Sequence, residues 1–90
     1  MLLQPTECID RLQLFATRSQ LYCERESATA ILAYSPDRQA WFVVRYSRGH
    51  LATALYRGMA LFTDNRYNYA LLTEEQLVKI CEQISNMKNL

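Results

Sequence analysis

Apolar residues near the two ends of the chain recur at the spacing of amphipathic helices. The N-terminal set comprises Cys8, Ile9, Leu12, Phe15 and Ala16. Thr6 stands just ahead of this set and can cap a helix, and Glu7 and Asp10 place negative charge in the first turn. No glycine marks the other end, which we place near residues 18–20. The pattern predicts a first helix capped by Thr6.

The C-terminal helix has a clearer start signal. Thr73-Glu74-Glu75-Gln76 fits a capping box, in which the Thr hydroxyl and the Gln side chain bond backbone N–H groups that would otherwise be unpaired. The apolar positions at helical spacing that follow are Leu77, Ile80, Cys81, Ile84 and Met87. We therefore expect a helix here, with one apolar face turned toward a core.

Between the two predicted helices the spacing changes to that of strands. Residues 21–25 alternate weakly, which suggests a short edge strand followed by a turn or bulge at Glu26-Ser27. Residues 28–34 and 40–47 are rich in apolar and aromatic side chains. They flank the turn sequence Ser35-Pro36-Asp37-Arg38-Gln39. Together these features predict a β-hairpin over about residues 28–34/40–47.

The pattern determines residues 48–68 less well. Arg48-Gly49-His50 is typical of a turn, and residues 51–62 suit either strand or helix. We favour strand, because Gly49 and Gly58 bracket a segment of hairpin length. Residues 64–68 are predicted to form a polar loop, since their Asp and Asn residues tolerate turn geometry.

These elements predict an α+β fold in a single domain over residues 1–90, with the N- and C-terminal helices packed on an antiparallel sheet. Alternation along residues 40–47 puts Phe42, Val44 and Tyr46 on one face, and Trp41, Val43 and Arg45 on the other. Two short helices cover only one face, so the Trp41 face needs another cover. We consider three covers: residues 51–62 folding back, a second copy of the chain, or another partner.

Composition changes this picture through the uneven placement of charge. The chain has a net charge of +1, which by itself favours no class of partner. Residues 38–69 hold five arginines, one aspartate and the only histidine, so they carry +4. The same stretch contains the sole tryptophan and four of the six tyrosines. Arginine with tyrosine and tryptophan is typical of surfaces that recognise proteins or nucleic acids.

Signals for metal binding and catalysis are weak. Cys8, Cys23, Cys81 and His50 match the ligand types of a Cys3His zinc site, but each belongs to a separate predicted element and no C-x2-C pair is present. No local motif supports a Cys–His catalytic pair, and there is no P-loop, Gly-rich phosphate loop or H-E-x-x-H sequence. We therefore predict no metal, no cofactor and no catalytic residues, and a protein that is not an enzyme.

The cellular location follows from what the chain lacks and from its cysteines. It shows no secretory signal and no apolar run long enough to span a membrane. Its three widely spaced cysteines suit a reducing compartment better than a disulfide framework. We expect a cytoplasmic protein with no membrane partner.

The function that these observations favour is a small non-catalytic protein-interaction module, such as an adaptor, regulator or inhibitor. The expected partner is another protein with an acidic surface, or a second copy of the chain in a homodimer. Nucleic-acid binding by the same surface is the alternative, less favoured because lysine is scarce and the pI is near neutral. The predicted partner-binding residues are Trp41, Val43, Arg45, Arg48, His50, Arg57, Arg66, Tyr67 and Tyr69.

Overall fold

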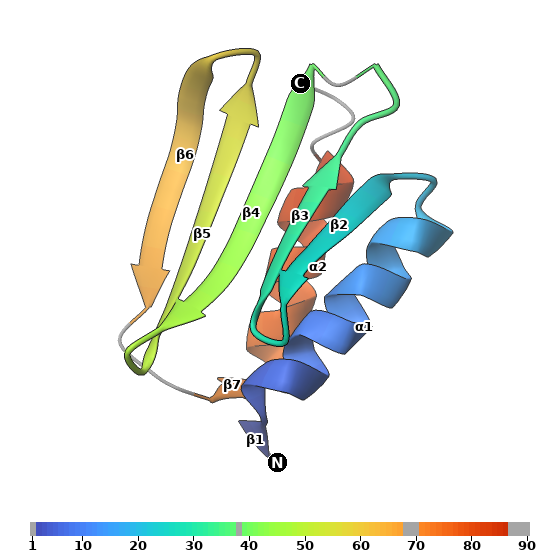
Figure 1. Ribbon diagram of the computed structural model, residues 1–90. Helices are drawn as coiled ribbons and strands as arrows, with labels where there is room; N and C mark the ends of the chain where they lie inside the picture. Colours follow the sequence, from blue (N-terminus) through green and yellow to red (C-terminus); the bar gives the residue numbers. More distant parts are fainter. Residues whose placement is uncertain (1, 38, 68–70, 87–90) are drawn as a thin grey trace.

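Two helices pack on one face of an antiparallel sheet, so the fold is α+β as the sequence predicts (Figure 1). The computed structural model describes residues 2–37, 39–67 and 71–86. Its elements are β1 (Leu2–Leu3), α1 (Pro5–Arg18), β2 (Tyr22–Ser27), β3 (Ala30–Tyr34), β4 (Ala40–Ser47), β5 (His50–Arg57), β6 (Ala60–Tyr67), β7 (Leu72–Thr73) and α2 (Glu74–Asn86). Neither helix is long and apolar enough to cross a membrane.

The five longer strands form a meander in which each strand pairs with the next one along the chain, in the order β2-β3-β4-β5-β6. Short connections between sequence neighbours allow this antiparallel pairing throughout. The two shortest strands, β1 and β7, pair separately and bring the start of α1 close to the start of α2. Both helices lie on the same side of the meander, and the β5–β6 hairpin lies at the side away from α1 (Figure 1).

The predicted hairpin is confirmed as β3 and β4, joined through residues 35–39. Inside this turn the Ser35 hydroxyl donates to Asp37 Oδ1 at 2.5 Å, and the Gln39 N–H donates to the same oxygen at 3.0 Å. These two hydrogen bonds hold the pKa of the Asp37 carboxyl below its usual value, and the bond from Ser35 has the larger effect. Of the turn or bulge expected at Glu26-Ser27, the structure has the bulge, as a register shift between Arg25 and Ser27.

Residues 51–62 are strand, as we favoured, and belong to β5 and β6. The β4–β5 turn consists of Arg48 and Gly49, both with positive φ (52° and 78°). Positive φ at both central residues is the geometry of a type I′ turn, whose twist matches that of the flanking strands. Gly58, with φ 61°, opens the next two-residue turn between β5 and β6.

The prediction of a polar loop over residues 64–68 is wrong, because β6 continues to Tyr67. Asp64 and Arg66 are exposed, and they stand opposite Ala54 and Ala52 of β5. β6 is an edge strand, so polar side chains on its open face cost little and do not end the strand. Asn68 lies outside the described residues.

The predicted Thr6 cap is also wrong, because α1 begins at Pro5, two residues before the Glu7 that a Thr6 cap would make the first helical residue. Its N-cap residue is Gln4, which makes no side-chain capping bond. Proline suits the first helical position, since the N–H that it lacks would be unpaired there in any case. The predicted end near residues 18–20 is confirmed, because α1 ends at Arg18.

The capping box of α2 is confirmed in both directions. The Thr73 N–H donates to Gln76 Oε1 at 2.9 Å, and the Gln76 N–H donates to the Thr73 hydroxyl at 3.2 Å. Leu77, Ile80 and Ile84 of α2 are buried, as the helical spacing predicts. The prediction for Met87 lies outside the described residues.

One hydrophobic core fills the space between the helices and the sheet face that they cover, which we call the inner face. Phe42 and Val44 are buried there and Tyr46 is half-buried, which confirms the predicted alternation along β4. β5 adds Leu51 and Leu55 to the same core. Residues 51–62 therefore extend the sheet rather than fold back over it, which excludes the first of the three covers considered for the Trp41 face.

Candidate functional site

The candidate site is the sheet face opposite the helices, which we call the outer face. Strand register and alternation assign its side chains. They are Tyr22, Glu24, Leu32, Tyr34, Trp41, Val43, Arg45, Ser47, His50, Ala52, Ala54, Tyr56, Leu61, Asp64 and Arg66. No described helix or loop packs over this face, because α1 and α2 both lie behind the sheet.

Aromatic side chains form a row across one end of the outer face, which we call the aromatic row. It consists of Tyr22, Tyr34, Trp41 and Tyr56, which stand opposite one another on four successive strands. The rings of Trp41 and Tyr56 stack with centroids 3.9 Å apart and planes 7° apart, and those of Tyr22 and Tyr34 lie 5.6 Å apart. The Trp41 Nε1–H also donates to the Gly58 carbonyl at 3.2 Å. Trp41 is therefore held in one orientation.

The sequence prediction included Trp41 but left Tyr22, Tyr34 and Tyr56 out of the site. Tyr22 and Tyr34 belong to strands N-terminal to the arginine-rich stretch, so the composition of that stretch did not point to them. Tyr56 lies within the stretch, and its place beside Trp41 follows from the β4–β5 register. Pairing the hairpin outward from its turn would have placed Tyr34 opposite Trp41, as the register does. Tyr22 requires the β2–β3 register as well, which the bulge shifts by one residue.

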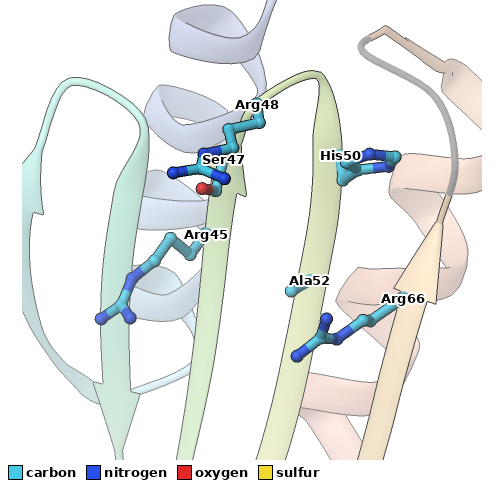
Figure 2. Close-up of a pocket in the computed structure, with 6 residues that line it drawn as sticks. All are labelled: Arg45, Ser47, Arg48, His50, Ala52 and Arg66. Atoms are coloured by element: carbon cyan, nitrogen blue, oxygen red, sulfur yellow. The ribbon is translucent and has the colours of Figure 1, made fainter.

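Cationic side chains gather at the other end of the outer face, around the β4–β5 turn (Figure 2). They border a hollow of about 480 Å³, which we call the cationic hollow. Its lining residues are Arg45, Ser47, Arg48, His50, Ala52 and Arg66. In Figure 2 the three arginine side chains extend in the same general direction: Arg66 from β6 across β5 toward Ala52, Arg48 beside Ser47, and Arg45 from β4 toward β3.

The charges around this hollow are only partly compensated. Arg45 donates to Glu26 Oε2 at 2.8 Å, which uses one of its five N–H groups. Arg48 and Arg66 form no ion pair or side-chain hydrogen bond with any other residue that the structure describes. Two guanidinium groups at this end therefore retain their full capacity to bind an anion.

A second hollow, of about 290 Å³, continues from the first along β4 and β5. The two share Arg45 and Ala52 in their linings. The floor of the second hollow is made by the small side chain of Ala54 beside Val43, and Trp41 and Tyr56 stand at its far end. We call this the apolar hollow; together the two hollows form a shallow path from the arginines to the aromatic row.

The structure brings together six of the nine predicted site residues on the outer face: Trp41, Val43, Arg45, Arg48, His50 and Arg66. Arg57 does not join them. It pairs with Ala40 at the opposite end of β5 from Arg48, and alternation places it with the inner-face positions. The side chain of Tyr67 and the whole of Tyr69 lie outside the described residues, so their predicted role stays a prediction.

The cysteines lie apart from this face. Cys8 is buried in the core and Cys81 is half-buried beside it, and burial raises the pKa of both thiols. A raised pKa lowers the fraction of reactive thiolate. Cys23 stands in register with Ala33 on the inner face, 3.6 Å from the Thr17 hydroxyl. The sheet therefore separates all three cysteines from His50, which lies on the outer face.

Within residues 2–37, 39–67 and 71–86, no group of three or more His, Cys, Asp or Glu side chains is arranged to hold a metal ion. The arrangement of the outer face suits binding of a ligand that combines negative charge with apolar surface. Comparisons of the chain with protein-family models, with curated proteins and with solved structures find no match.

Proposed function

We propose that this protein is a small non-catalytic interaction module of the cytoplasm, which binds another protein through the outer face of its sheet. The observation that supports the proposal most strongly is the contrast between the two faces. Both helices pack on the inner face, while the outer face presents the aromatic row and an apolar hollow that no described element covers. Its three free cysteines are in keeping with a reducing compartment.

The outer face has the composition of a binding surface, and its side chains would lose little conformational entropy when a partner binds. Tryptophan, tyrosine and arginine are the residues enriched at interface hot spots, and all three occur here. Trp41 is already fixed by its stacking on Tyr56 and its hydrogen bond to Gly58, so little side-chain entropy is lost when a partner packs against it. Tyr22 and Leu61, which are 57% and 52% exposed, extend the apolar surface toward both sheet edges.

The proposal is tested by affinity capture from the native host with matched variants. Val43→Asp introduces a charge at the centre of the outer face, and Ala54→Gln fills the same hollow without charge. Val78→Asp is the control: Val78 is 52% exposed, but it lies on α2, on the other side of the sheet. Each variant is first checked by circular dichroism and thermal melting, so that only folded proteins are compared.

We expect the captured protein, identified by mass spectrometry, to be lost with Val43→Asp and Ala54→Gln but retained with Val78→Asp. A buried charge at an apolar contact costs several kcal/mol, which is enough to abolish capture. Nuclease treatment should leave capture unchanged. Equal capture by all four proteins would contradict a role for the outer face, and loss of capture after nuclease treatment would favour the nucleic-acid alternative.

A further inference from the structure

We propose that the outer face binds an extended acidic segment of a partner protein, with its carboxylates in the cationic hollow and an apolar side chain in the apolar hollow. This inference rests on the proposed function and adds the chemistry of the partner segment and the spacing of its groups. The carboxylates would lie near Arg48 and Arg66, and the apolar side chain over Val43 and Ala54, toward Trp41.

Charge complementarity is the first ground for an acidic partner. Arg66 reaches over the small side chain of Ala52, where a bound group would sit (Figure 2). Arg45 lines the same hollow from β4, but its guanidinium extends toward β3 and bonds Glu26, so Arg48 and Arg66 are the described arginines of this hollow that are left to bind an anion. Guanidinium groups bind carboxylates through pairs of parallel hydrogen bonds, so two carboxylates would satisfy the described unpaired arginines.

The backbone at Arg48 is the second ground. Arg48 occupies the first position of the type I′ turn with φ 52°, where asparagine or glycine is the ordinary residue. A non-glycine side chain in this left-handed region is strained, and short polar side chains such as asparagine offset the strain locally. The structure shows no ion pair of Arg48 with any described residue that would offset this strain. A ligand contact would account for arginine at this position.

The geometry of the two hollows sets the spacing of the two groups along the segment. They are continuous through Arg45 and Ala52. Trp41 and Arg45 lie four residues apart on β4, which corresponds to about 13 Å along a strand. An extended peptide spans the same distance in about four residues. An acidic pair and an apolar residue about four positions apart would therefore reach both hollows together.

Several observations favour a protein segment over nucleic acid. A nucleic acid carries a phosphate at every nucleotide, and the path from the arginines to the aromatic row passes Asp64, which lines the apolar hollow. Phosphates beside Asp64 would be repelled. Trp41 and Tyr56 also cover each other's facing ring surfaces, so those surfaces cannot stack on a base. A peptide, by contrast, can carry its negative charge only at the end that lies near the arginines, away from Asp64.

The test uses fluorescence anisotropy with labelled probes on the full chain. The first probe is a peptide with two adjacent glutamates and a leucine about four residues further on. The second replaces both glutamates with glutamine, and the third is a single-stranded oligothymidine. The protein variants are Arg48→Asn, which suits the turn, and Arg66→Gln. Arg57→Gln is the matched control, because it removes the same charge from the other end of β5.

We expect the wild-type protein to bind the glutamate peptide, with affinity that falls as salt is raised. Arg48→Asn and Arg66→Gln should each weaken this binding by about fivefold or more, while Arg57→Gln changes it by less than about twofold. The glutamine peptide should bind about tenfold more weakly than the glutamate peptide. Arg48→Asn should melt at the same temperature as the wild type or higher, which excludes misfolding as the cause of its loss.

Other outcomes would overturn the assignment. Equal binding of the glutamate and glutamine peptides, or no effect of Arg48→Asn and Arg66→Gln, would remove the acidic-segment proposal. Tighter binding of oligothymidine, weakened by the same variants, would assign the hollow to nucleic acid. If the glutamate peptide fails to bind while capture of the native partner still depends on Val43, the acidic assignment alone is wrong. Capture that ignores Val43→Asp would instead refute the proposed function.

Discussion

Gln20 and Arg48 are the described non-glycine residues with positive φ, at 64° and 52°. Gln20 follows the end of α1, where the Leu21 N–H donates to the Ala16 carbonyl and the Gln20 N–H donates to the Thr17 carbonyl. These two bonds make a Schellman motif, whose left-handed position is usually glycine. The helix thus ends in a common backbone motif that carries an uncommon residue. For this reason no glycine marks the boundary in the sequence.

Replacing Gln20 with glycine should relieve this strain. We expect Gln20→Gly to raise the free energy of unfolding by about 0.5–1 kcal/mol, because the left-handed penalty exceeds the added chain entropy of glycine. Gln20→Ala keeps a Cβ atom and should give no such gain. Urea denaturation followed by circular dichroism measures both. A Gln20→Gly protein no more stable than Gln20→Ala would show that the position is unstrained.

At the scale of elements, the features that the sequence predicted well are those held by contacts between near neighbours. The capping box at Thr73–Gln76 and the turn around Asp37 depend on side chains two or three residues apart. β6 and the β1–β7 pair depend on partners distant in sequence or on edge position. Local residue preference predicted a loop at Asp64 because it carries no information about which strand stands beside it.

The contact between the helices also joins distant residues. Arg11 of α1 donates two hydrogen bonds to the Glu74 carboxylate at the start of α2, at 2.7 and 2.9 Å. This bonding lowers the pKa of Glu74 in the folded protein. A carboxyl with a depressed folded pKa stabilises the fold above its unfolded pKa, near 4.3, and the stabilisation is lost as pH falls through the folded pKa.

The pH dependence of stability should therefore change when Glu74 cannot ionise. We expect Glu74→Gln to melt slightly below the wild type at pH 7, with the difference shrinking between about pH 5 and pH 3. The difference should be small because both partners are exposed and solvent screens the pair. Thermal melts over this pH range measure it, and Arg11→Gln should show the same trend. A difference that is constant with pH would argue against the ion pair.

At the scale of the whole molecule, the described arginines of residues 38–69 lie toward two opposite ends of the sheet. Successive turns of a meander alternate between the two ends of the strands, so Arg48 lies just before the start of β5 and Arg57 at its end. Composition over residues 38–69 could not separate them. Alternation along β4 predicted the Trp41, Val43 and Arg45 face correctly, whereas the convergence with Arg66 required the β5–β6 register.

The arrangement of the whole outer face also bears on self-association. In a face-to-face homodimer with its two-fold axis along the strands, the cationic hollows of the two copies would meet. With the axis across the strands, each cationic hollow would meet the aromatic row, which contains no acidic residue. The first arrangement brings arginines together, and in the second the carboxylate beside the row, that of Glu24, already accepts a hydrogen bond from the Tyr34 hydroxyl at 3.5 Å.

We therefore expect the isolated protein to be a monomer. Size-exclusion chromatography with light scattering at two concentrations should give the mass of one 10.5 kDa chain in both cases. A dimer that forms with rising concentration and is lost in Val43→Asp would assign the outer face to a second copy. That result would contradict the acidic-segment proposal and support the homodimer that the sequence also suggested.

The position of Trp41, stacked on Tyr56, gives the protein a fluorescent reporter of one sheet face. Trp41 is the sole tryptophan, and it lies on the outer face rather than in the core. Its fluorescence emission therefore reports the environment of the outer face, while far-ultraviolet dichroism reports the helices and the sheet. Denaturation followed by both signals would separate loosening of that face from loss of the fold, without any added label.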